Sequence, residues 1–134
     1  MNEDPVMVAP DTSIGELRRI LLNSGNTVIL VMKEDRVVGV IGDRDLLRPD
    51  SEHLTAKDVM NTKVVNVSVD CSMREACSLL VDAATPGLPV VNDDGNLIGV
   101  VSARDIVSGM VGDEGVTKIS VEAASIYLAM TRSR

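Results

Sequence analysis

Hydrophobic and polar residues alternate along this chain with two different periods. Four short runs rich in Val, Ile and Leu are typical of buried strands, because β-branched side chains pack well on a pleated surface. These runs lie at residues 28–32, 36–41, 88–91 and 97–101. Polar turns join them in pairs, and the second turn contains an Asp-Gly step that favours a hairpin. The pattern therefore predicts two β-hairpins.

A helix is predicted before each hairpin, because apolar residues recur there at helical spacing. They are Ile14, Leu17 and Leu21 in the first stretch and Met73, Ala76 and Leu80 in the second. Each stretch begins with Ser-x-x-Glu, at Ser13 and at Ser72. This spacing lets the serine oxygen and the glutamate carboxylate each satisfy a free backbone N–H, so both serines are predicted helix starts.

The two halves of the chain repeat each other. At a shift of 59 residues, Met1-Asn2 matches Met60-Asn61, and further identities follow. Val6, Val8, Asp11, Ser13, Glu16 and Leu21 match Val65, Val67, Asp70, Ser72, Glu75 and Leu80. One inserted residue then changes the shift to 60, which pairs Val31, Gly39, Val40, Arg44 and Asp45 with Val91, Gly99, Val100, Arg104 and Asp105. Such long self-similarity indicates two copies of one structural unit.

Each copy is predicted to fold as β-α-β-β-α, with first strands at 6–8 and 64–67 and last helices beginning at Gly42 and Ser102. Neither copy alone can bury both faces of so small a sheet. The two are therefore expected to pack with pseudo-twofold symmetry and to leave a cleft between them as the natural ligand site. The predicted class is α/β (α+β). The predicted divisions are repeat one at 1–48, a linker at 49–56, repeat two at 57–110, and a C-terminal loop and helix at 111–134.

Composition limits the chemistry of that cleft. Of the 134 residues, 45% are hydrophobic but only 1% are aromatic, the single Tyr127, so a base could be held only between aliphatic side chains. The net charge of −7 argues against a nucleic-acid polymer, whose binding depends on neutralising phosphates with Lys and Arg. No apolar run reaches membrane-spanning length and no leader sequence opens the chain, which favours a cytoplasmic protein that does not bind membranes.

Metal and redox chemistry have little support in the sequence. Cys71 and Cys77 are the only cysteines and His53 is the only histidine, which is too few for a structural zinc site of four Cys/His ligands. The two cysteines are interpreted as small buried apolar residues. A disulfide to another chain stays open as an alternative.

The most specific local pattern runs from a strand into a helix start. It reads Gly99-Val100-Val101-Ser102-Ala103-Arg104-Asp105, and residues 39–45 repeat the same plan. The simplest interpretation is a capping box of Ser102 with Asp105, which stabilises a helix by about 1 kcal/mol. A functional interpretation is also open. A helix start suits phosphate, and a carboxylate can accept hydrogen bonds from two ribose hydroxyls.

The arrangement resembles a pair of cystathionine β-synthase (CBS) domains, also called a Bateman module. Over residues 1–110, the motifs that carry the resemblance are Lys57-Asp58-Val59-Met60, Gly87-Leu88-Pro89-Val90-Val91 and the segment 99–105. The resemblance implies two composite clefts that bind adenosyl ligands: AMP, ADP, ATP, S-adenosylmethionine or, less often, NAD. It also implies a homodimer, no obligatory cofactor, no catalysis, and regulation of an effector protein that the sequence does not identify.

Carried over residue by residue, the resemblance implies two sets of site residues. Cleft A joins Asp4, Ala9, Asn26 and Thr27 to Val100, Ser102, Arg104 and Asp105. Cleft B joins Val40, Gly42, Arg44 and Asp45 to Lys63, Ser68, Pro86 and Gly87. Val100 and Val40 would be the aliphatic walls for the base. The two arginines either contact phosphate or are ordinary surface residues. At least one nucleotide per chain is expected, in a cleft that the sequence leaves open.

Three features depart from the family's pattern. Gly42 replaces the usual Ser or Thr in cleft B, the segment 28–31 lacks the proline seen at Pro89, and Asp4 stands where the other copy has Lys63. These departures leave open an interaction or oligomerisation scaffold with degenerate pockets. A nucleotide hydrolase is a third hypothesis, but the sequence offers neither a catalytic histidine candidate nor a Walker-type loop.

The C-terminal segment carries an apolar pattern of its own. After a stretch punctuated by Gly109, Gly112 and Gly115, apolar residues recur at helical spacing. They are Ile119, Ala123, Ile126, Tyr127 and Met130. Two interpretations stay open: a helix that covers the protein's own core, and a contact with a second copy or a partner.

Overall fold

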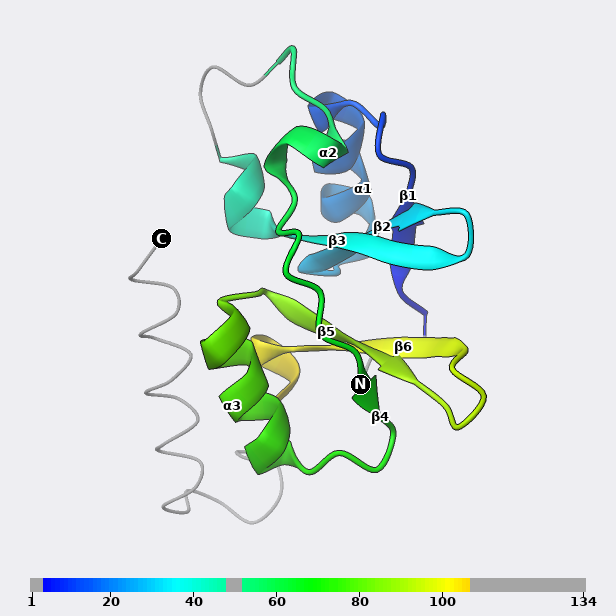
Figure 1. Cartoon of the computed structure of the whole chain (residues 1–134). Coiled ribbons are helices and arrows are strands. Elements are labelled where there is room, and N and C mark those ends of the chain that lie inside the picture. Colours follow the sequence, from blue (N-terminus) through cyan, green and yellow to red (C-terminus); the bar gives the residue numbers. More distant parts are fainter. Residues whose placement is uncertain (1–3, 48–51, 107–134) are drawn as a thin grey trace.

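The computed structural model describes residues 4–47 and 52–106, which form two similar units (Figure 1). Unit one contains β1 (Val6–Val8), α1 (Ile14–Ser24), β2 (Val28–Lys33), β3 (Arg36–Gly42) and the 3-10 helix η1 (Asp43–Leu46). After helix α2 (Ala56–Val59), unit two contains β4 (Val67–Ser68), α3 (Met73–Ala83), β5 (Gly87–Val91) and β6 (Leu97–Ser102), followed by helical residues 103–106. The predicted mixed class with two β-α-β-β-α repeats is confirmed. The predicted C-terminal helix at 111–134 lies outside the described residues.

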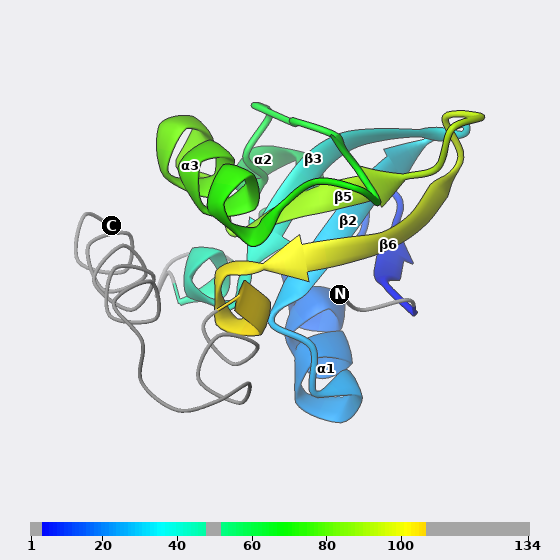
Figure 2. The same ribbon diagram turned by 90° about the horizontal axis from the view of Figure 1, so that it is seen from below.

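Each unit holds one three-stranded sheet, and the two sheets have the same topology. β1 runs parallel to β2 and β2 antiparallel to β3, and β4, β5 and β6 repeat this arrangement. The two sheets face each other, with α1 and α2 outside the first sheet and α3 outside the second (Figure 1). Figure 2 shows the strands of unit two crossing over those of unit one. This crossing brings the start of β2, in unit one, close to the end of β6, in unit two.

Alternation along β2 explains why its sequence is apolar throughout. Ile29 and Val31 lie in the core beneath α1, whereas Val28 and Leu30 lie in a second core between the sheets. This second core also holds Val100 of unit two. A strand that is buried on both faces has no polar side to show in its sequence. The core between the sheets is what joins the two units.

The structure corrects the position of the inserted residue in the repeat. Val67 pairs with Val90 as Val8 pairs with Val31, so the shift is still 59 in β5. The shift becomes 60 only in β6, after the turn at 92–96. The predicted match of Val31 with Val91 is therefore wrong by one residue. The insertion lies in a polar turn, where hydrophobic periodicity gives no signal.

Strand β4 is shorter than the predicted strand at 64–67. The Asn61 side chain ties down the backbone before it: Asn61 Oδ1 accepts from Lys63 N at 2.9 Å, and Asn61 Nδ2 donates to the carbonyl of Ala84 at 2.9 Å. Val64 packs in the core between the sheets. The segment is thus apolar because it is partly buried, while its backbone bonds go to local partners.

Helix α2 completes the core of unit one, although the sequence repeat places it at the start of repeat two. Ala56 is fully buried in the cluster that contains Ile14 and Leu46. Its N–H donates to the carbonyl of Thr12 at 2.8 Å, and Lys57 N donates to the carbonyl of Pro10 at 3.0 Å. The segment that precedes one unit along the chain therefore covers the other unit in space.

Helices α1 and α3 end in the same left-handed cap with different residues, Gly25 at φ 73° and Ala84 at φ 50°. A Cβ on Gly25 would meet nothing within 4 Å, so only backbone conformation favours glycine there. A left-handed conformation costs a residue with a Cβ about 1 kcal/mol. Urea denaturation is expected to show that Gly25→Ala lowers the free energy of unfolding by about that amount and that Ala84→Gly raises it. Shifts of the same sign in both variants would contradict this account.

Candidate functional site

A hollow of about 190 Å³ lies where the start of β2 faces the end of β6. Unit one lines it with Gly25, Asn26, Thr27 and Val28, and unit two lines it with Val100, Ser102, Arg104 and Asp105. The structure thus brings together six of the eight residues predicted for cleft A. These residues are far apart in the sequence, and they meet because the two sheets face each other.

Asp4 and Ala9 are not among the residues that line this hollow. β1 is parallel to β2, with Val6 beside Ile29 and Val8 beside Val31. Ala9 therefore follows β1 at the end remote from Thr27, and its carbonyl accepts from Thr12 N at 3.1 Å. Asp4 precedes β1 on the Thr27 side and is exposed.

Ser102 and Asp105 hold each other at the edge of the hollow. Asp105 Oδ2 accepts from Ser102 N at 3.0 Å, and Ser102 Oγ accepts from Asp105 N at 3.1 Å. This geometry confirms the capping box. The box engages only Oδ2 of the carboxylate, and a carboxylate has lone pairs on both oxygens. Asp105 can therefore cap the helix and also accept hydrogen bonds from the hydroxyls of a ligand.

In cleft B, a proline ring packs against the position that corresponds to Ser102. Gly42 stands where unit two has Ser102, and the corrected shift places Pro86 where unit one has Thr27. A Cβ on Gly42 would lie 2.8 Å from Cβ of Pro86 and 3.2 Å from its Cγ. Gly42 N still donates to Asp45 Oδ2 at 2.8 Å, so this half of the box persists. Cleft B therefore lacks both hydroxyls, and the proline ring lies where a Cβ at position 42 would be.

The other residues predicted for cleft B lie in different surroundings. Val40 is fully buried between the sheets, in the cluster that also holds Val100. Gly87 is buried too, where a Cβ would lie 3.0 Å from Cγ1 of Val28. Ser68 lines a different hollow in unit two. Arg44 and Lys63 are exposed.

Sequence reasoning missed Gly25 and Val28 as lining residues of the first hollow. With the corrected shift, Val28 corresponds to Gly87, which was predicted for cleft B. The correct repeat register would therefore have identified Val28. Gly25 lines the hollow as the C-terminal cap of α1. Glycine is common at such caps, so its place after the predicted helix was a usable signal.

Both cysteines lie in unit two, within the part of the chain that the structure describes. Cys77 is buried and Cys71 is partly buried, and both are free thiols. Burial raises the pKa of each thiol, which makes both poor nucleophiles. Within residues 4–47 and 52–106, three or more His, Cys, Asp or Glu side chains do not gather as a metal site. In the same ranges, every helix is too short or too polar to cross a membrane.

Comparison with known proteins identifies relatives of both units. The family model described as CBS domain matches residues 1–52 and 56–112. Inosine-5'-monophosphate dehydrogenase of Methanocaldococcus jannaschii is 33% identical over 106 residues, which cover 78% of this chain and 21% of that protein. The chain spans between 21% and 44% of the length of three curated relatives.

Two similar solved structures contain a nucleotide. The cytosolic domain of the Mg²⁺ channel MgtE in complex with ATP is 30% identical, with a TM-score of 0.62, and the match covers 80% of this chain and 45% of that one. CBSX2 of Arabidopsis thaliana in complex with AMP is 27% identical, with a TM-score of 0.64, and the match covers 81% of this chain and 89% of that one.

Proposed function

Because the chain belongs to the CBS domain family, as a tandem pair of such domains, we propose that it is a regulatory module that binds an adenosyl ligand. AMP is the first candidate, and ADP, ATP and S-adenosylmethionine are the others. The observation that carries the proposal is the hollow between the units, where a carboxylate, a guanidinium and two hydroxyls meet. The AMP complex of CBSX2 and the ATP complex of MgtE support this class of ligand.

The residues of the hollow suit the three parts of a nucleotide. Asp105 would accept hydrogen bonds from the ribose hydroxyls, as acidic residues do in dinucleotide sites. Arg104 is exposed at the hollow and would contact phosphate. Val28 and Val100 would hold the base between aliphatic side chains, since no aromatic ring lines the hollow. Each role belongs to a different side chain, so each can be tested by one substitution.

We infer further that cleft A is the occupied cleft. Thr27 and Ser102 provide hydroxyls there, whereas Pro86 packs against Gly42 at the equivalent place. A ligand that bound in cleft B as in cleft A would meet the proline ring. One ligand per chain is the consequence.

Calorimetric titration with AMP, preceded by an absorbance measurement at 260 nm for co-purified nucleotide, tests this function. Saturable binding of one AMP per chain is expected. With no Trp and one Tyr in the sequence, nucleotide carried through purification would dominate that absorbance. If AMP, ADP, ATP and S-adenosylmethionine all fail to bind and the protein is free of nucleotide, the proposed function is wrong.

A scaffold with degenerate pockets is the second candidate function, and the packing of Pro86 on Gly42 favours it because the ring takes up space in one of the two clefts. It predicts a stable oligomer without saturable adenosyl binding. A homodimer and an effector protein are expected under the regulatory proposal as well, so the titration and not the oligomeric state separates the two. Incubation with ATP and magnesium is expected to give no product, since the proposed role is regulatory and not catalytic.

A further inference from the structure

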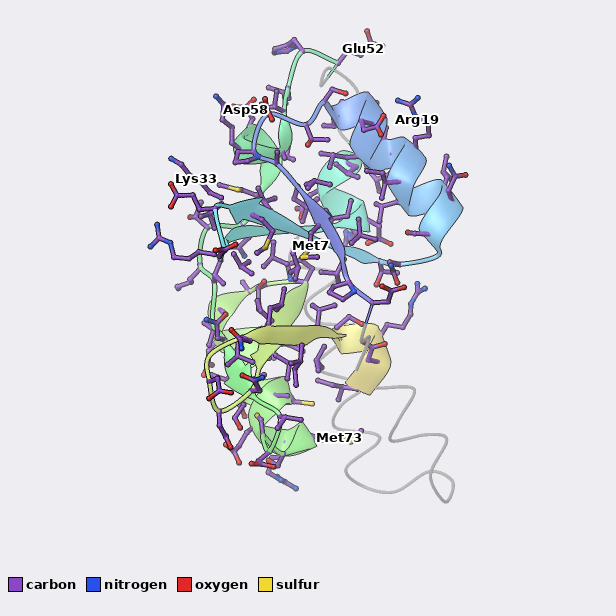
Figure 3. The ribbon with its side chains drawn as sticks, turned by 90° about the vertical axis from the view of Figure 1, so that its right-hand side faces the viewer. Met7, Arg19, Lys33, Glu52, Asp58 and Met73 are labelled. Atoms are coloured by element: carbon purple, nitrogen blue, oxygen red, sulfur yellow. The ribbon has the colours of Figure 1, made fainter. Side chains whose placement is uncertain are left out.

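The two clefts differ in a pair of residues that opposite units contribute. Side chains of both units fill the space between the sheets (Figure 3), so the residues at each end of this interface decide whether a ligand can enter there. At one end, Thr27 of unit one and Ser102 of unit two line the ligand hollow. At the other end their counterparts are Pro86 of unit two and Gly42 of unit one, and these two residues are in close contact.

Cleft B nevertheless keeps the charged half of the site. Arg44 and Asp45 stand at the positions of Arg104 and Asp105. Both arginines are exposed and both aspartates are partly buried. Asp45 Oδ2 accepts from Gly42 N at 2.8 Å, and Asp105 makes the corresponding bond at 3.0 Å. The residue types that the proposed function assigns to phosphate and to the ribose are therefore retained in cleft B.

The helix that carries Asp45 is held in place by its own unit. Arg18 Nε, from α1, donates to the carbonyl of Leu46 at the end of η1 at 3.0 Å. At the start of η1, Asp43 N donates to the carbonyl of Thr27 at 3.1 Å. Both bonds lie within unit one and neither involves Pro86. A change at Pro86 should therefore leave η1 where it is.

We propose that Pro86, through its contact with Gly42, is the residue that restricts this chain to one adenosyl ligand, and that cleft B is a latent second site. This inference rests on the proposed function. A Cβ on Gly42 would lie 2.8 Å from Cβ of Pro86, whereas carbon atoms pack best at about 3.5–4.0 Å. A serine at position 42 therefore requires the ring to be absent. The glycine and the proline act as a pair, and both must change to copy cleft A.

The double variant Gly42→Ser with Pro86→Thr gives cleft B the two hydroxyls of cleft A and removes the ring. Calorimetric titration is expected to show two AMP per chain in this variant and one in the native chain. The second AMP should bind about 10- to 100-fold more weakly than the first, because Gly87 lacks the aliphatic side chain with which Val28 lines cleft A.

Asp45→Ala identifies where the second AMP lies. Added to the double variant, it should remove the second AMP and leave the first, whereas in the native chain it should leave binding nearly unchanged. Gly42→Ser alone is the matched control, since it adds a hydroxyl while the ring stays, and it should still bind one AMP. Pro86→Thr alone introduces no crowding and should also gain a second, weaker AMP, so it tests the inference if the double variant does not fold. Circular dichroism establishes which variants are folded.

The outcomes separate this inference from the proposed function. One AMP per chain in every folded variant that lacks the ring would overturn the inference and leave the proposed function standing. A second AMP that persists after Asp45→Ala would also overturn it, because the ligand would then lie elsewhere. If the native chain binds no adenosyl ligand, the proposed function fails and the inference fails with it.

Discussion

Asp105→Ala is expected to lower the affinity for AMP about 10- to 100-fold, whereas Asp45→Ala should leave it nearly unchanged. The affinity falls because the substitution removes a carboxylate that accepts hydrogen bonds from the ligand hydroxyls. A hydrogen bond to a charged group contributes about 1.5–3 kcal/mol. Asp105 lines the open hollow. Asp45 occupies the same position beside Gly42, where Pro86 fills the space.

The two aspartates are a matched pair because each also accepts a backbone hydrogen bond. Asp105 Oδ2 accepts from Ser102 N at 3.0 Å, and Asp45 Oδ2 accepts from Gly42 N at 2.8 Å. Both substitutions therefore remove a cap, worth about 1 kcal/mol of stability, and only one should remove a ligand contact. Calorimetric titration of both variants measures the difference. An equal loss of affinity in both would mean that capping, and not ligand contact, accounts for the effect, and a loss confined to Asp45→Ala would move the ligand to cleft B.

The repeat, the strands and the helix caps could be predicted because each leaves a local mark in the sequence. Ser13 and Ser72 accept from the N–H groups of Glu16 and Glu75 at 3.2 and 3.1 Å, as the Ser-x-x-Glu spacing predicts. The predicted reciprocal half of each box, in which the glutamate carboxylate accepts from the serine N–H, is wrong. The Glu16 carboxylate bonds to Arg19, and the Glu75 carboxylate accepts from the Ser72 hydroxyl. Side-chain partners on an exposed helix surface have several alternatives of similar energy.

The state of the two clefts could not be predicted, because it depends on a contact between residues remote in sequence. Gly42 alone indicates a missing hydroxyl, and Pro86 alone indicates a rigid turn. Only the structure shows that the Pro86 ring packs where a side chain at position 42 would lie. The same limit applies to α2, whose sequence places it with repeat two while its hydrogen bonds to Pro10 and Thr12 place it on unit one.

The core between the sheets depends most on Leu30, and its replacement by Ala is expected to have the largest effect on stability. Leu30 is fully buried in a cluster of four buried residues, three from unit one and Val100 from unit two. Leu-to-Ala substitutions in such positions cost about 2–5 kcal/mol, because they remove buried methyl groups and leave a cavity. Leu30 is the only leucine among three buried valines, so no other buried side chain of this cluster is as large.

Leu22→Ala is the control for this measurement, because Leu22 is 85% exposed on α1. That substitution should change the free energy of unfolding by less than about 0.5 kcal/mol. Urea denaturation of both variants, followed by circular dichroism, gives the two values. Leu30 also shares its cluster with Val28 and Val100, which line the ligand hollow. Leu30→Ala should therefore weaken AMP binding as well. If this variant lost less than about 1 kcal/mol of free energy of unfolding, other contacts would have to hold the two sheets together.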